Sequence, residues 1–153
     1  MVEMKSEPYT ITFGIIGAGR IGKLHADNLL SHVKGAKLKT VTDPFLDEEW
    51  AASRNIPVTG KDHRIMLDDP EIDAILIGSP SPEHAAQMIE CARAGKHIFC
   101  EKPIALDPDI IRNALAEVEK SGVKLQVGFN RRFDPNFAAV QQQVASGALG
   151  DPH

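Results

Sequence analysis

The fold of this chain is decided by the stretch Thr12-Phe13-Gly14-Ile15-Ile16-Gly17-Ala18-Gly19-Arg20-Ile21-Gly22-Lys23-Leu24-His25. An apolar run suited to a buried strand ends in Gly17-x-Gly19-x-x-Gly22, and a helical pattern follows at once. Gly17 allows the tight turn, Gly19 lets the backbone approach a diphosphate, and Gly22 lets the helix pack on the strand. Exposed N–H groups and the helix dipole then favour the anion. We expect cofactor contacts from Gly17, Gly19, Arg20, Ile21 and Gly22, although a Gly-rich turn without a ligand is the alternative.

Strand-like and helix-like segments alternate along the rest of the chain. Apolar runs predict strands near residues 11–17, 38–42, 56–59, 73–78, 97–100 and 123–129. Helical patterns lie between them, with start signals at Ser81-Pro82, Asp107-Pro108 and Asp134-Pro135. This alternation favours an α/β fold, a doubly wound parallel sheet of about six strands with helices on both faces. A diphosphate turn after the first strand makes it a Rossmann dinucleotide-binding domain.

Composition limits the partners of the chain. Its 153 residues have room for one sizeable core, and a formal net charge of −4 leaves no basic footprint for nucleic acid. No apolar run approaches the length of a membrane span. Cys91 and Cys100 lack metal-ligand spacing, so no metal site is expected. Two cysteines that act as small buried side chains fit a reduced, cytoplasmic compartment.

An acidic residue follows the second predicted strand. Asp43 lies 21 residues after Gly22 (43 − 22), where a carboxylate can accept hydrogen bonds from the adenosine ribose. A 2′-phosphate there would be repelled by roughly 4 kcal/mol at a separation of about 4 Å and an effective dielectric of about 20. Pro44 and Phe45 follow, with no Arg or Lys to receive that phosphate. NAD is therefore favoured over NADP, unless Asp43 only caps the next helix.

The segments that leave the later strands carry polar residues toward the same edge of the sheet. After the fourth strand, a carbonyl of Ser79 or Pro80 could face the nicotinamide ribose, and His84 is either a cofactor contact or a surface or capping histidine. After the fifth, Lys102 could meet a substrate hydroxyl beside the nicotinamide or remain a solvated loop lysine. After the sixth, Asn130 can hydrogen-bond an amide or a hydroxyl, and we expect it to contact the cofactor.

These residues together resemble the Gfo/Idh/MocA oxidoreductase family. The resemblance rests on the glycine turn with His25, on Ser79-Pro80 with His84, and on the stretches Gly95-Lys96-His97 through Glu101-Lys102-Pro103 and Gly128-Phe129-Asn130-Arg131-Arg132-Phe133-Asp134. It covers nearly the whole chain, and Glu-Lys-Pro is its most specific part. The last stretch is most similar to that of inositol 2-dehydrogenases, which oxidise myo-inositol with NAD.

The resemblance implies roles for several residues. Lys102 belongs to the catalytic group and contacts the substrate, Lys102-Pro103 is a cis bond, and Arg131 approaches the substrate. Asp43, the Ser79-Pro80 loop and the Glu101 region contact the cofactor. The alternatives are another sugar dehydrogenase of the family, acting on scyllo-inositol, glucose or a UDP-sugar, or a non-catalytic NAD-binding sensor or scaffold.

The resemblance also implies a second domain that supplies an Asp and a His and forms the usual oligomer interface. We expect residues 1–130 to be the Rossmann domain, with a loose tail at residues 1–9. Residues 131–153 would be a connecting helix and the start of the substrate domain. Because the chain ends after a turn, we expect a truncated, inactive chain that lacks this domain. Homo-oligomers are expected only for the full-length protein.

Overall fold

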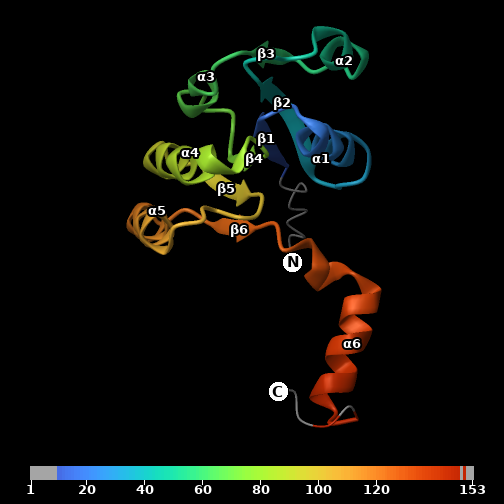
Figure 1. Cartoon of the computed structure of the whole chain (residues 1–153). Coiled ribbons are helices and arrows are strands. Elements are labelled where there is room, and N and C mark those ends of the chain that lie inside the picture. The colour runs from blue at the N-terminus through green and yellow to red at the C-terminus, as the bar shows by residue number, and fades with distance from the viewer. Residues whose placement is uncertain (1–9, 149, 151–153) are drawn as a thin grey trace, which may run out of the picture.

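The computed structural model describes residues 10–148 and 150, so the predicted tail at residues 1–9 and the end of the chain lie outside the described residues. The strands are β1 (Ile11–Ile16), β2 (Ala36–Thr42), β3 (Val58–Gly60), β4 (Ala74–Ile77), β5 (His97–Cys100) and β6 (Leu125–Val127). The helices are α1 (Arg20–Ser31), α2 (Glu48–Ser53), α3 (Arg64–Leu67), α4 (Ser81–Arg93), α5 (Pro108–Ser121) and α6 (Pro135–Ala145), and a short 3-10 helix, η1 (Asn130–Phe133), precedes α6. Figure 1 shows their arrangement.

All six strands form one parallel sheet. The strand order is β3-β2-β1-β4-β5-β6, so the chain begins in the middle of the sheet and builds outward to both edges. The direction of growth reverses between β1 and β4, and ligands bind at such a switch point, beyond the carboxyl ends of the strands. The order confirms the predicted doubly wound Rossmann fold.

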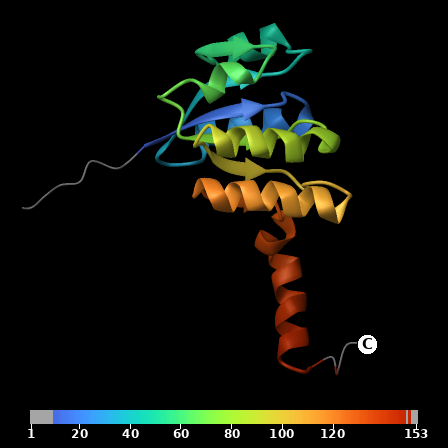
Figure 2. The same ribbon diagram turned by 90° about the vertical axis from the view of Figure 1, so that its left-hand side faces the viewer.

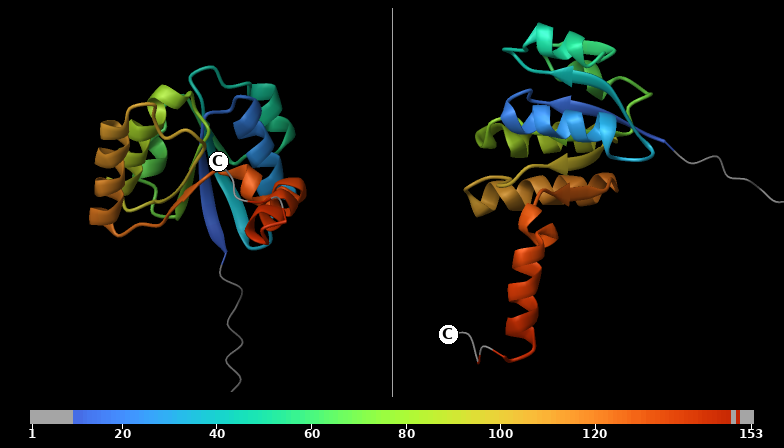
Figure 3. Two further views of the ribbon diagram at one scale, coloured as in Figure 1. Left: turned by 60° about the horizontal axis from the view of Figure 1, so that its bottom comes forward. Right: turned by 90° about the vertical axis from the view of Figure 1, so that its right-hand side faces the viewer.

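Helices cover both faces of the sheet, as Figure 3 shows with α3, α4 and α5 on one side and α1 and α2 on the other. In β4, Ile75 and Ile77 belong to the apolar cluster under α4 and α5, whereas Leu76 belongs to the cluster under α1. Successive side chains of a strand point to opposite faces, and every residue of β4 is buried. A nearly continuous apolar strand is what a sheet covered on both sides requires.

Two helices begin at the aspartates that the sequence marks as caps. Asp107 accepts a hydrogen bond from the Asp109 backbone N–H at the start of α5, and that helix ends at Gly122 with a φ of +68°. Asp134 caps α6 in the same way. The strands differ more from prediction: β3 starts two residues later than expected, and β6 is shorter than residues 123–129.

The last helix leaves the body of the domain. Figures 1 and 2 show α6 extending away from the sheet, across the direction of α4 and α5. None of its residues is buried, and Phe137 and Val140 are 45% and 58% exposed. The division of the chain after residue 130 remains a prediction.

None of the helices in the described part of the chain combines the length and the hydropathy needed to cross a membrane.

Burial makes both cysteines poor nucleophiles. Cys91 and Cys100 are free and fully buried, and desolvation raises the pKa of each thiol to about 12. Because the thiolate is the reacting form, we expect the folded chain to react much more slowly at about pH 8 with an aromatic disulfide reagent than the chain unfolded in guanidinium. Spectrophotometric thiol counting checks this, and fast reaction of both thiols in the folded chain would contradict it.

Candidate functional site

The glycine turn joins β1 to α1 by close backbone contacts. Gly17 has a φ of +91°, and a Cβ added there would lie 2.6 Å from the Ser79 backbone nitrogen. A Cβ on Gly22 would overlap the Gly17 carbonyl oxygen, whereas one on Gly19 would meet nothing within 4 Å. Glycine is therefore required at positions 17 and 22 for the chain to fold, because a side chain at either position would clash with the protein's own backbone. The space beside the Gly19 backbone is open, so a ligand could approach the backbone there.

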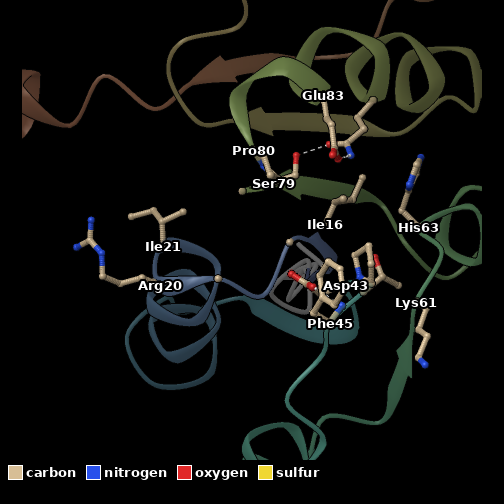
Figure 4. Close-up of a pocket in the computed structure, with 16 residues that line it drawn as sticks. Ile16, Arg20, Ile21, Asp43, Phe45, Lys61, His63, Ser79, Pro80 and Glu83 are labelled. Atoms are coloured by element: carbon tan, nitrogen blue, oxygen red, sulfur yellow. Dashed lines mark hydrogen bonds between the residues drawn. The ribbon is translucent and has the colours of Figure 1, made fainter.

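A cavity of about 480 Å³ lies at this turn (Figure 4). It brings together most of the predicted cofactor contacts, namely Gly17, Gly19, Arg20, Ile21, Asp43, Ser79 and Pro80. Gly22 is buried beneath the turn and does not line the cavity. Figure 4 shows the Arg20 side chain pointing away from Asp43 and Ser79.

The Asp43 carboxylate is held by two backbone N–H groups. One oxygen accepts from Ala18 at 2.7 Å, inside the glycine turn, and the other from Phe45 at 2.8 Å. A carboxylate oxygen has two lone pairs, so each keeps one for a further donor. Asp43 thus ties the end of β2 to the turn and presents free acceptor sites to the cavity, as ribose recognition needs.

The Ser79-Pro80 loop is fastened to α4. The Ser79 hydroxyl donates to the Gln87 side chain at 2.6 Å (Figure 4), and the Pro80 carbonyl accepts the Glu83 N–H at 2.9 Å. The Ser79 carbonyl lies 2.8 Å from a ring nitrogen of His84. Both carbonyls that the sequence directs at the nicotinamide ribose are thus already engaged within the protein.

His84 and Glu101, both predicted cofactor contacts, do not line this cavity. His84 is 1% exposed on the core side of α4. The Glu101 carboxylate lies 2.8 Å from His25 on α1 and also accepts the Lys102 backbone N–H at 3.3 Å. In the structure both side chains connect protein segments, and the sequence could not show this because neither side chain's direction follows from its position in a motif.

A second cavity, also about 480 Å³, lies where β5 and β6 end. Its lining residues are Lys102, Phe129, Asn130, Arg131 and Arg132. Lys102 is exposed, and no carboxylate among the described residues forms an ion pair with it. The Lys102-Pro103 peptide bond is cis, as the family resemblance implies. Asn130 faces this cavity together with Lys102 and not the dinucleotide cavity where the sequence places it.

Several lining residues of the first cavity were not predicted as cofactor contacts, among them Lys61 and His63. Lys61 and His63 reach it from the loop after β3, which pairs with β2. The Asp43 N–H donates to the Gly60 carbonyl at 3.0 Å, so the two strand ends lie side by side. Knowing that β3 is the edge strand next to β2 would have identified both residues.

These features fit a dinucleotide. The space beside Gly19 is open, and α1 begins at the cavity, so the free backbone N–H groups of its first turn are available to a diphosphate. The Asp43 carboxylate can still accept hydrogen bonds from ribose hydroxyls. In the described part of the chain, no group of three or more His, Cys, Asp or Glu could hold a metal ion. Fold and cavity together define a dinucleotide-binding Rossmann domain.

Comparison with known proteins identifies the family. Residues 11–129 match the Gfo/Idh/MocA family model, described as an oxidoreductase family with an NAD-binding Rossmann fold. The chain belongs to this family, and its cofactor is NAD.

Similar proteins include an uncharacterized oxidoreductase, YrbE, of Bacillus subtilis, which is 50% identical over 94% of this chain and 42% of the relative. The myo-inositol 2-dehydrogenase of Thermotoga maritima is 39% identical over 92% of this chain and 42% of its own length. A crystal structure of scyllo-inositol dehydrogenase from Lactobacillus casei with bound NAD(H) and scyllo-inositol superposes with a TM-score of 0.85 at 36% identity, over 93% of this chain and 43% of that one. The chain spans less than half the length of these relatives.

Two glycine substitutions separate folding from binding. For Gly22→Ala, we expect a loss of about 1–3 kcal/mol in the free energy of unfolding, because the added methyl overlaps the Gly17 carbonyl. For Gly19→Ala, we expect the free energy of unfolding to stay within about 0.5 kcal/mol of the parent value. The affinity for NAD should fall by about tenfold or more, because the added methyl occupies the open space that the ligand needs.

Denaturant unfolding and calorimetric titration with NAD measure both effects. Parent-like NAD affinity in Gly19→Ala, or parent-like stability in Gly22→Ala, would contradict this account of the turn.

Asp43 is expected to set the choice between NAD and NADP. In Asp43→Ser, removal of the charge that opposes a 2′-phosphate should shift the ratio of NAD to NADP affinity toward NADP by about tenfold or more. Asp62→Ser, at an exposed carboxylate that does not line the cavity, should leave the ratio unchanged. Titration of each variant with both nucleotides tests this, and an unchanged ratio in Asp43→Ser would refute it.

Proposed function

We propose that this chain provides the NAD-binding part of an enzyme that oxidises a hydroxyl of a cyclic polyol to a ketone, with myo-inositol as the substrate. The reaction is assigned to a protein of the relatives' full length, because the chain spans only 42–44% of them. The observation that carries the proposal is the second cavity, which Lys102, Asn130 and Arg131 line together at the carboxyl edge of the sheet.

Each residue of the second cavity has a chemical role in this proposal. When bound, NAD⁺ accepts a hydride from the substrate carbon. The Lys102 Nζ hydrogen-bonds to the reacting hydroxyl and helps to remove its proton. The Asn130 amide and the Arg131 guanidinium donate to neighbouring hydroxyls of the ring. Arg131 lies over the Phe137 ring at 4.5 Å, and this cation–π contact favours its orientation.

The names of the relatives support an inositol. Among those similar to this chain are a myo-inositol 2-dehydrogenase and a scyllo-inositol 2-dehydrogenase that uses NAD. Both inositols are neutral rings that carry a hydroxyl on every carbon, which suits a cavity lined by amide and cationic donors. For the full-length protein, we further propose a cytoplasmic location, supported by the two free buried cysteines, and assembly into homo-oligomers.

Lys102 provides the test of the enzymatic role. In the protein expressed from the complete reading frame, Lys102→Ala should lower turnover by about 10²–10⁴-fold with little change in NAD affinity, because only the proton transfer is lost. Lys34→Ala, at an exposed lysine outside both cavities, is the matched control. NADH formation with myo-inositol measures turnover.

Unchanged turnover in Lys102→Ala would contradict the mechanism. NAD binding without turnover on myo-inositol, scyllo-inositol, glucose or UDP-glucose would favour a non-catalytic sensor or scaffold. Faster turnover on a substrate other than myo-inositol would assign the chain to another sugar dehydrogenase of the family.

A further inference from the structure

The Glu101 carboxylate lies where three segments come together beyond the ends of β5 and β6. One of its oxygens lies 2.8 Å from Nε2 of His25 on α1, and the other accepts the Lys102 backbone N–H at 3.3 Å. Its third neighbour is Gly128, just after β6, where an added Cβ would lie only 3.1 to 3.2 Å from the carboxylate atoms. The carboxylate therefore adjoins the helix of the glycine turn and both segments that lead into the second cavity.

Backbone hydrogen bonds fix the strand ends on either side of this carboxylate. The Glu101 N–H donates to the Ile77 carbonyl at 3.0 Å, and the Gly128 N–H donates to the Cys100 carbonyl at 2.8 Å. The ends of β4, β5 and β6 are therefore still joined to one another at this point. The second cavity begins one residue later, at Lys102. The Glu101 side chain is thus the last fixed group before the lysine proposed to act on the substrate.

His25 holds this carboxylate from the side of α1. An ionised carboxylate can only accept a hydrogen bond, so Nε2 of His25 donates it, and a neutral ring with its proton on that nitrogen is sufficient. The His25 and Glu101 side chains are only 21% and 17% exposed, and the His25 ring packs edge to face against Phe99 of β5, with the ring centroids 5.2 Å apart. Because the contact is sheltered from water, it is stronger than the same contact on an open surface.

We propose that His25 and Glu101 are positioning residues that fix the Lys102 segment and the end of β6 relative to α1. The first turn of α1 lines the dinucleotide cavity, and Lys102 lines the second cavity. The hydrogen-bonded pair thus joins the helix that receives the cofactor to the segment that carries the lysine. The effect on turnover rests on the proposed function, whereas the connection between the segments does not.

Variants of nearly equal size test the pair in the protein expressed from the complete reading frame. His25→Gln keeps an N–H donor and Glu101→Gln keeps an acceptor oxygen, whereas His25→Met and Glu101→Met lack these groups. We expect kcat to fall by about tenfold or more in both Met variants and by less than about threefold in both Gln variants, because Lys102 is displaced when the contact is lost. The affinity for NAD should change by less than about threefold, since the glycine turn is unaltered. His32→Met, at an exposed histidine that ends α1, should behave like the parent.

Hydrogen exchange tests the connection without any turnover, on the 153-residue chain. The Lys102 amide loses its acceptor in Glu101→Met, and in His25→Met that acceptor is no longer held in place. We expect this amide to exchange about tenfold or more faster in both variants than in the parent, with the amides of α6 unchanged. Amide NMR measures the exchange rates and shows whether each variant is folded.

Turnover and exchange together separate the positioning role from the proposed function. A parent-like kcat in the Met variants would overturn the positioning role, and so would equal losses in the Met and Gln variants, since these indicate packing alone. Unchanged exchange at Lys102 would overturn the connection itself. If the parent shows no turnover, or Lys102→Ala leaves it unchanged, the proposed function fails, while the exchange rates still decide the connection.

Gly128→Ala tests the same carboxylate with both side chains of the pair left in place. The added methyl would lie within 3.2 Å of the Glu101 carboxylate and displace it, so kcat should fall by about threefold or more. This variant decides the matter if a Met variant fails to fold. A parent-like kcat together with parent-like exchange at Lys102 would then overturn the proposal.

Discussion

The contact between Gly22 and the Gly17 carbonyl oxygen determines where α1 begins. No side chain fits between them, so the helix starts as soon as β1 has turned. Because α1 begins so close to the strand end, its free N–H groups and the positive end of its dipole face the cavity. A bulkier residue would force the helix away from the sheet and remove the anion site with it.

The strand order arranges the rest of the site around this turn. Since β2 and β4 flank β1, Asp43 and Ser79 leave the sheet on either side of the glycines, and β5 brings Lys102 one strand further along. Side-chain to backbone hydrogen bonds then hold the loops together. Asp43 ties β2 to the turn, and His84 lies between the loops after β4 and β5. Cofactor binding and the proposed chemistry thus share one framework of polar contacts.

Much of this arrangement could be predicted from local sequence. Apolar runs located all six strands, and Asp107 and Asp134 marked their helix starts, because these signals depend on neighbouring residues alone. The spacing of Asp43 from the glycines indicated that this residue lies near the glycine turn, and it does line the cavity there. Which cavity Lys61 and Asn130 line, and the burial of His84, could not be predicted. Their positions depend on which strands are neighbours and on which way a side chain points, and both are settled by tertiary packing.

The central claim is that the turn, the end of β2 and the loop after β4 form one NAD site. Titration of the isotope-labelled chain with NAD⁺, followed by amide NMR, tests it most directly. The account predicts that the largest shifts fall on Gly17 to Gly22, on Asp43 to Phe45 and on Ser79, with little change in α6. Shifts confined to other surfaces, or no saturable shifts at all, would contradict it.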